Sequence, residues 1–278
     1  MHASTLSASA HSRFTLNKIR IFRASKAVTG AIFLACVLAG CGGGGSSAAP
    51  TPSVPSAPAP PANPVSVVPS IQPGNWVVMG SSTAAGIGAT AGKGWVALLQ
   101  AERVKNGDVL VNIAKGGAST YDAMSSGSAP VLNRPLPDPA VNIDQALTRK
   151  PVLLIVAFPT NDTDSGFSVD ETVGNLLAIR ARALAASVPV LIVSTQPRAL
   201  STSKLSLLRD IDERMAKEVG ACFVAVREKL AGPDDKLAAA YNSGDGAHPN
   251  DLGHAVIANA VSTVLHSDTC VRISPSAK

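Results

Sequence analysis

Residues 151–158, PVLLIVAF, are the stretch of this sequence that decides the fold. The run is apolar throughout, and turn-forming residues bound it. An uninterrupted apolar run of this length is typical of a β-strand that is buried on both faces of a sheet. Because such a strand needs a further layer above it and another below it, the run predicts helices on both sides of a sheet.

The sequence from residue 73 onward alternates between such runs and longer amphipathic stretches. Further strands are predicted at residues 75–80, 108–114, 189–197 and 221–228. Helical spacing of apolar residues occurs at residues 94–104, 141–150, 170–187, 203–220 and 250–265. Strands that alternate with helices predict an α/β fold, with a five-stranded parallel sheet between two layers of helices.

Residues 1–40 have the composition of an export signal. They contain no acidic residue and five basic residues: Arg13, Lys18, Arg20, Arg23 and Lys26. The apolar run that follows, at residues 27–39, is too short to span a bilayer comfortably, so the segment is interpreted as a secretory signal. Leu38-Ala39-Gly40-Cys41 resembles the bacterial lipobox, which predicts cleavage before Cys41 and a lipid on that cysteine. An ordinary signal cut near Gly40 is the alternative.

Residues 41–72 carry no charge and consist mainly of Gly, Ser, Ala and Pro. Such a segment cannot bury enough apolar surface to fold, so we expect a flexible tether there and a folded domain over residues 73–278. A lipid and a tether would hold the domain at the cell envelope. Gly42, which stands where an Asp would favour inner-membrane retention, favours the outer membrane or its periplasmic face in a Gram-negative cell.

The net charge of +5 comes from the signal. The chain has 24 basic and 19 acidic residues, and five of the basic residues lie in the signal, so the remainder carries 19 of each. A neutral mature chain gives no reason to expect nucleic-acid binding, and we expect a monomer. A single set of strands also argues against the two α/β lobes of a periplasmic solute-binding protein.

Two of the four cysteines lie in the expected folded domain. Cys36 falls in the signal and Cys41 in the lipobox, which leaves Cys222 and Cys270. Since cysteines of exported proteins are commonly paired, we expect these two to form a disulfide, with two buried free thiols as the alternative. The sequence contains no cysteine and histidine spacing typical of a zinc site.

Residues with acyl-transfer chemistry follow the predicted strands. Ser82 follows the first strand, Gly117 the second and Asn161 the third, whereas Asp245 and His248 precede the last helix. The carboxyl ends of the strands in an open α/β sheet form the ligand-binding edge, so these residues should meet. A serine nucleophile needs a base, an imidazole backed by a carboxylate provides one, and the oxyanion needs N–H donors.

The order of these residues resembles the SGNH (GDSL) hydrolase superfamily, whose sequence blocks supply Ser, Gly, Asn and His. The matching positions are Gly80-Ser81-Ser82 with Gly86, Asn112 with Gly117, Asn161-Asp162, and Asp245 with His248-Pro249. The resemblance implies a flavodoxin-like three-layer α/β/α sandwich and ester hydrolysis without a metal or an organic cofactor. Substrates across the superfamily range from acetylated sugars to lysophospholipids and acyl thioesters, so a small-molecule, glycan or lipid ester is expected.

The resemblance also assigns roles. Ser82 is the expected nucleophile, His248 the general base and Asp245 the carboxylate that orients His248. The backbone N–H groups of Ser82 and Gly117 and the side-chain amide of Asn161 are the expected oxyanion hole. The same set would serve an acyltransferase. A non-catalytic envelope or carbohydrate-binding lipoprotein on the same fold is the rival from another class.

Other residues near the blocks have alternative interpretations. Ser81 stands where the superfamily usually has Asp, and Pro159 replaces a Gly. Asp162 is the second candidate for the acid, interpreted as a loop-stabilising residue. Tyr121 and Phe158, the aromatic residues nearest to the blocks, are candidate substrate contacts.

The run Asp245, His248, Asp251 and His254 has a regular spacing that could suggest a metal site. Gly246 between them argues against one continuous helix that carries all four side chains. We therefore expect no metal, and we interpret His254 as a packing or hydrogen-bonding residue of the last helix.

Overall fold

The computed structural model describes residues 68–158 and 160–274. The expected export signal, Cys41, the tether up to residue 67, and Pro159 lie outside the described residues. Within the described ranges, no helix combines the length and the apolar character needed to cross a membrane.

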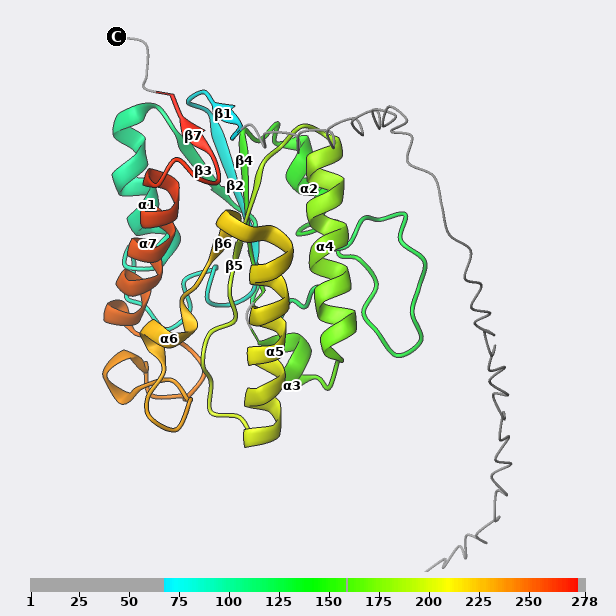
Figure 1. The fold of residues 1–278 in the computed structure, drawn as a ribbon, viewed down its shortest axis with the longest axis vertical. Helices are drawn as coiled ribbons and strands as arrows, with labels where there is room; N and C mark the ends of the chain where they lie inside the picture. Colours follow the sequence, from blue (N-terminus) through cyan, green and yellow to red (C-terminus); the bar gives the residue numbers. More distant parts are fainter. Residues whose placement is uncertain (1–67, 159, 275–278) are drawn as a thin grey trace, which may run out of the picture. The chain divides into compact units, whose positions relative to one another are not determined.

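A five-stranded sheet lies at the centre of the fold, in the order β3-β2-β4-β5-β6 (Figure 1). The strands are β2 (Asn75–Gly80), β3 (Val109–Asn112), β4 (Leu153–Ala157), β5 (Val190–Val193) and β6 (Phe223–Val224). Every neighbouring pair is parallel. With β2 counted as the first strand, this is the strand order of flavodoxin-like folds. The prediction of an α/β/α fold with five parallel strands is confirmed.

Helices cover both faces of the sheet. They are α1 (Trp95–Arg103) and α7 (Asp251–His266) on one face, and α2 (Ile143–Thr148), α4 (Val169–Ala185) and α5 (Thr202–Val219) on the other (Figure 1). Alternate residues of one strand point to opposite faces. Ile155 of β4 therefore packs in the core under α1 and α7, while Val156 packs in the core under α2, α4 and α5.

The last strand is shorter than its sequence predicts. Of the predicted strand at residues 221–228, only Phe223–Val224 pair with β5. A 3-10 turn, η2 (Gly220–Cys222), precedes the pair, and a short helix, α6 (Arg227–Leu230), follows it. The backbone N–H of Val226 donates to the side-chain oxygen of Ser194. Because this bond replaces a ladder bond, the chain leaves the sheet at this point.

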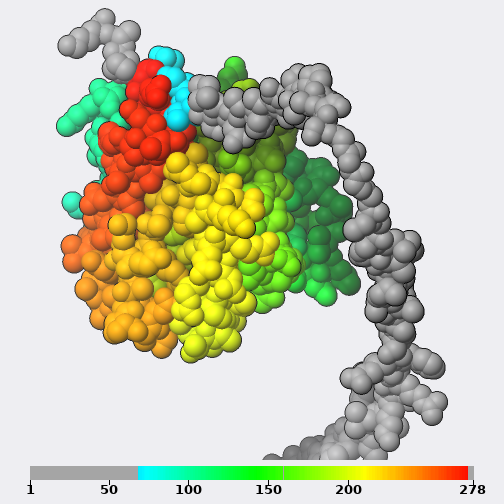
Figure 2. Space-filling view, viewed as in Figure 1, coloured from blue at the N-terminus to red at the C-terminus, as the bar shows by residue number. Residues whose placement is uncertain are grey.

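A second, two-stranded sheet joins both ends of the described chain. β1 (Ser70–Ile71) pairs in parallel with β7 (Arg272–Ile273), and the two lie side by side at one end of the fold (Figures 1 and 2). Ordered pairing therefore begins before the domain boundary expected at residue 73. Just before β7, Cys270 forms a disulfide with Cys222, with an S–S distance of 2.06 Å.

Candidate active site

The segments that follow the strands meet at the end of the sheet opposite to β1 and β7. They enclose a cavity of about 220 Å³, called here the Ser82 cavity. The residues that line it are Ser82, Ile87, Gly117, Thr160, Asn161, Gln196, Arg198, Ala247 and His248. Four of the five residues predicted for acyl transfer thus line one cavity, and Asp245 lies directly behind His248.

A chain of hydrogen bonds connects Ser82, His248 and Asp245. The Oγ of Ser82 lies 2.8 Å from Nε2 of His248, and Nδ1 of His248 lies 2.6 Å from Oδ2 of Asp245. This is the geometry in which an imidazole can take a proton from a serine hydroxyl while a carboxylate holds its other nitrogen. Ser81 does not take part. It is buried, does not line the cavity, and its hydroxyl has no hydrogen-bond partner among the described residues.

Backbone groups of its own turn fix the carboxylate of Asp245. Oδ1 accepts hydrogen bonds from the N–H of Ala247 and the N–H of His248, each at 2.8 Å. Burial alone would raise the pKa of Asp245, but the His248 side chain and these two N–H groups lower it well below its usual range. Asp245 is therefore a carboxylate at neutral pH. It can orient His248 and stabilise a positive charge on the imidazole.

Three groups that can donate to an oxyanion face the same cavity. Within the described part of the chain, the backbone N–H groups of Ser82 and Gly117 have no hydrogen-bond acceptor. Gly117 has a φ of 80°, a left-handed conformation that favours glycine. Nδ2 of Asn161 donates to the carbonyl of Ala118 at 2.8 Å. An amide nitrogen carries two hydrogens, so one remains for a ligand in the cavity.

The loop after Ser82 packs against the segment that carries His248. Gly88 has a φ of 95°, and a Cβ on it would lie 2.2 Å from the carbonyl oxygen of Pro249 and 2.8 Å from Cβ of His248. Only glycine allows this approach. Sequence reasoning missed Gly88, because its one signal is a Gly-x-Gly spacing from Gly86, and the contact depends on a residue far away in the chain.

His254 holds the same loop from the side of α7. Its Nδ1 accepts from the N–H of Trp95 at 3.2 Å, and its Nε2 lies 3.1 Å from the carbonyl oxygen of Ile87. These partners require a neutral ring with the proton on Nε2, and burial lowers its pKa. His254 is thus a hydrogen-bonding residue of the core. Among the described residues, no group of His, Cys, Asp and Glu could hold a metal ion.

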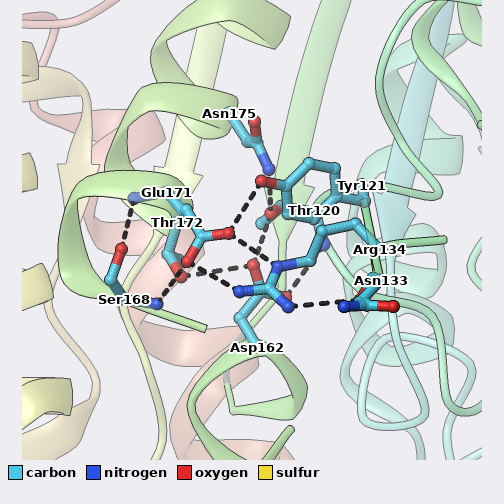
Figure 3. Close-up of polar contacts among 9 residues, drawn as sticks. All are labelled: Thr120, Tyr121, Asn133, Arg134, Asp162, Ser168, Glu171, Thr172 and Asn175. Carbon is cyan, nitrogen blue, oxygen red and sulfur yellow. Dashed lines mark hydrogen bonds and ion pairs between the residues drawn. The ribbon is translucent and has the colours of Figure 1, made fainter. Parts of the chain in front are cut away.

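Asp162, the second candidate for the acid, does not contact His248. Its carboxylate accepts from the N–H of Thr120 at 2.9 Å, from the hydroxyl of Thr120, and from the hydroxyl of Thr172 at 3.2 Å (Figure 3). Burial raises its pKa, and these donors oppose that effect. The contacts connect the chain just after Gly117 with the helix α3 (Asn161–Asp164), so Asp162 holds together the two segments that carry Gly117 and Asn161.

The expected substrate contacts Tyr121 and Phe158 are not brought to the Ser82 cavity. The hydroxyl of Tyr121 donates to Glu171 at 3.0 Å, and Arg134 forms an ion pair with the same carboxylate (Figure 3). Tyr121 lines a different cavity, and Phe158 is buried in the core under α4 and α5. The expectation rested on sequence distance from the motifs, which does not report the direction of a side chain.

Two polar residues after β5 line the Ser82 cavity without having been predicted. Nε2 of Gln196 donates to the carbonyl of Ala247 at 2.6 Å, and so connects this strand end to the segment that carries His248. Arg198 lies two residues further on and lines the cavity as well. The rule that ligands bind at the carboxyl ends of strands would have found both residues had it been applied to β5.

Solved structures share the fold. The psychrotrophic esterase EstA from Pseudoalteromonas sp. is 17% identical, with 69% of this chain and 97% of that chain covered, at a TM-score of 0.51. TesA is 21% identical, with 70% and 99% covered, at a TM-score of 0.54. An acetyl xylan esterase, AlAXEase, is 15% identical, with 69% and 99% covered, at a TM-score of 0.54. At these identities the likeness is one of fold.

Sequence comparison gives the family. No curated protein sequence matches the chain significantly. The model of the GDSL-like Lipase/Acylhydrolase family, however, matches residues 78–256. This match spans most of the described domain and contains Ser82, Gly117, Asn161, Asp245 and His248. The chain therefore belongs to the GDSL-like lipase/acylhydrolase family of hydrolases.

Proposed function

We propose that the chain is a serine ester hydrolase that works through an acyl-enzyme intermediate. One observation carries the proposal: the hydrogen-bonded series Ser82–His248–Asp245 ends at a cavity that also holds free N–H donors. These are the N–H groups of Ser82 and Gly117, which have no acceptor among the described residues, and the second amide hydrogen of Asn161. A turn serine without a catalytic role would need neither the base nor the donors. Membership of a hydrolase family supports the same conclusion.

The first half of the reaction acylates Ser82. The hydroxyl attacks the ester carbonyl while Nε2 of His248 takes its proton. The carbonyl oxygen becomes an oxyanion, which accepts hydrogen bonds from the N–H groups of Ser82 and Gly117 and from the Asn161 amide. His248 then gives its proton to the leaving alcohol, the bond between the carbonyl carbon and that alcohol breaks, and an acyl-serine remains.

The second half releases the acid. His248, neutral again, takes a proton from a water molecule that attacks the acyl-serine. The same donors stabilise the second oxyanion, and His248 returns the proton to Ser82 as the acid leaves. An alcohol in the place of this water would make the protein an acyltransferase. A cavity of about 220 Å³ is smaller than the roughly 300–1,000 Å³ typical of drug-sized ligands, which supports a carboxylesterase or acetylesterase for short acyl groups.

The test measures turnover of p-nitrophenyl acetate by the wild type, Ser82→Ala and Ser81→Ala. Loss of a triad serine should lower kcat by about 10⁴- to 10⁶-fold, whereas Ser81→Ala should retain turnover. A serine-directed fluorophosphonate should add mass to the wild type and to Ser81→Ala, but not to Ser82→Ala. A wild type that neither turns over acetyl to octanoyl esters nor reacts with the fluorophosphonate would instead be a non-catalytic envelope or carbohydrate-binding protein.

We also propose that the chain is exported and carries a lipid on Cys41. The basic segment, the short apolar run and the Leu38-Ala39-Gly40-Cys41 motif support this proposal, as does a disulfide of the kind found in exported proteins. In a Gram-negative host fed an alkyne fatty acid, the full chain should acquire the label and fractionate with the outer membrane. Cys41→Ser should remain unlabelled. A label that persists in Cys41→Ser would contradict the anchor site.

A further inference from the structure

Arg198 gives the Ser82 cavity a fixed positive charge. Among the described residues that line the cavity, only Arg198 has a permanently charged side chain, and His248 is already engaged with Ser82 and Asp245. Arg198 follows β5, whereas Asn161 follows β4 and Ser82 follows β2. The sheet order places β4 between β2 and β5, so the three residues reach the cavity from the ends of three neighbouring strands.

The charge of Arg198 is only partly neutralised. Its guanidinium forms an ion pair with Asp164 at 3.0 Å, and Lys204 forms another with the same carboxylate at 3.1 Å. Two cations thus share one anion, and the cluster keeps one net positive charge beside the cavity. A guanidinium carries five N–H donors in a planar fork, which suits carboxylate and phosphate groups. The ion pair with Asp164 leaves donors of the guanidinium for a ligand.

The backbone beside Arg198 is held against the segment that carries His248. The N–H of Ala199 donates to the carbonyl of Gly246 at 2.7 Å, and Gln196 bonds to Ala247. The side chain of Arg198 is one quarter exposed, so it is partly shielded from solvent yet open to a ligand. Its backbone is therefore fixed relative to His248, which is what a binding group for a substrate substituent requires.

We propose that this cavity takes short esters that carry an anionic group, a carboxylate or a phosphate, and that Arg198 binds that group. The inference rests on the proposed ester hydrolase function. It adds a substrate class: the charged substituent pairs with Arg198 while the ester carbonyl lies between Ser82 and the oxyanion donors. The anion can belong to the acid or to the alcohol half of the ester, and the two halves are tested separately.

The experiment compares each anionic ester with its neutral carboxamide isostere. For the acid half the pair is monoethyl succinate and ethyl succinamate, and for the alcohol half it is acetoxyacetate and acetoxyacetamide. A pH-stat measures kcat and KM for the wild type, Arg198→Gln, Arg198→Lys and Arg214→Gln. Arg214 is the matched control, since its loss changes the net charge equally and it pairs with Asp170, whose side chain is 87% exposed.

In at least one pair, Arg198→Gln should lower kcat/KM for the anionic ester, relative to its carboxamide, by about 10- to 100-fold, mostly through KM. Arg198→Lys should recover part of the loss, and Arg214→Gln should keep the wild-type ratio. Asp164→Asn, which removes the competing carboxylate, should raise the ratio. Because this change is expected in the opposite direction, Asp164→Asn tests the role of Arg198 even if Arg198→Gln does not fold.

The role of Arg198 would be overturned if the ratio of kcat/KM for the anionic ester to kcat/KM for its carboxamide stays within twofold of the wild-type ratio in Arg198→Gln for both pairs. An equal loss of this ratio in Arg214→Gln would overturn it as well. That outcome leaves the proposed hydrolase intact as long as the wild type turns over p-nitrophenyl acetate. A wild type that is inactive on every ester and does not react with the fluorophosphonate overturns the hydrolase, and this inference with it.

Discussion

Removing the Cys222–Cys270 disulfide should destabilise the domain by an amount that can be worked from the structure. The two cysteines are 48 residues apart in sequence. In the chain-entropy model, a cross-link that closes a loop of this length lowers the entropy of the unfolded chain enough to stabilise the folded state by about 4 kcal/mol at 25 °C. The folded state also loses the covalent link between the segments that lead into β6 and β7, because Cys222 lies just before β6 and Cys270 just before β7.

Urea unfolding of the oxidised protein, of the reduced protein, and of the double variant Cys222→Ala/Cys270→Ala measures this effect. Both tryptophans, Trp76 and Trp95, are buried, so their fluorescence reports the loss of the core. With a slope of about 2 kcal/mol/M, the midpoint should fall by about 2 M urea after reduction. The double variant should match the reduced protein and should not respond to dithiothreitol.

The bridge lies at the opposite end of the sheet from the Ser82 cavity, so the double variant should keep wild-type kcat/KM below its melting temperature. Two results would refute the reasoning. One is an oxidised protein whose midpoint does not change on reduction, which would mean that the cysteines are not bonded. The other is a double variant that still responds to dithiothreitol.

Three further predictions concern the site and its surroundings. Asn161→Ala should lower kcat by about 10²- to 10³-fold with a smaller change in KM, because the variant lacks one of the proposed oxyanion donors; an unchanged kcat in p-nitrophenyl acetate assays would contradict that role of Asn161. The Arg134 guanidinium lowers the pKa of Glu171 to about 2. The ion pair is therefore complete above the ordinary pKa of a glutamate and is lost as the pH falls toward 2. Glu171→Gln should accelerate proteolysis of the segment at residues 125–140, which contains Arg134, at neutral pH, and an unchanged cleavage rate would show that the ion pair does not hold this segment. Burial lowers the pKa of His254 in the folded protein below its ordinary value of 6.5. As the pH falls, His254 is therefore protonated in the unfolded chain before it is protonated in the folded protein, and stability should fall as the pH drops below about 6.5. His254→Gln should weaken that dependence in thermal melts, and an unaltered pH profile would contradict the assignment.

Sequence reasoning succeeded where the determinants are local. The strand predicted at residues 75–80 is β2 with the same bounds, because a strand buried on both faces is apolar at nearly every position. The last helix begins after Asn250, whose side chain accepts from the N–H of Gly253, as a helix-capping asparagine does. Asp245 and His248 are three residues apart, so one turn of chain is enough to join them.

The features that the sequence did not reveal depend on contacts between distant segments. The β1–β7 sheet consists of two-residue strands at the two ends of the described chain, too short for any periodic pattern. Gly88 is needed only because Pro249 passes beside it. Arg198 lines the cavity because β5 lies next to β4, and the apolar pattern of the two strands does not predict that they are neighbours.

The hydrogen bonds between the loops explain why the Ser82 cavity can be rigid although it is built almost entirely from loops. Three side-chain amides that follow or end the strands each donate an N–H to the backbone carbonyl of another segment: Asn112 to Ala84 at 2.7 Å, Asn161 to Ala118 at 2.8 Å, and Gln196 to Ala247 at 2.6 Å. The bond between His248 and Ser82 connects the Ala247 segment with the loop after β2. A loop shift that misplaces Ser82 must therefore break a directed hydrogen bond, so these bonds also fix the distances between Ser82, His248 and the N–H donors of the cavity. Substitution of these amides should for this reason lower kcat even at temperatures at which the variant is still fully folded.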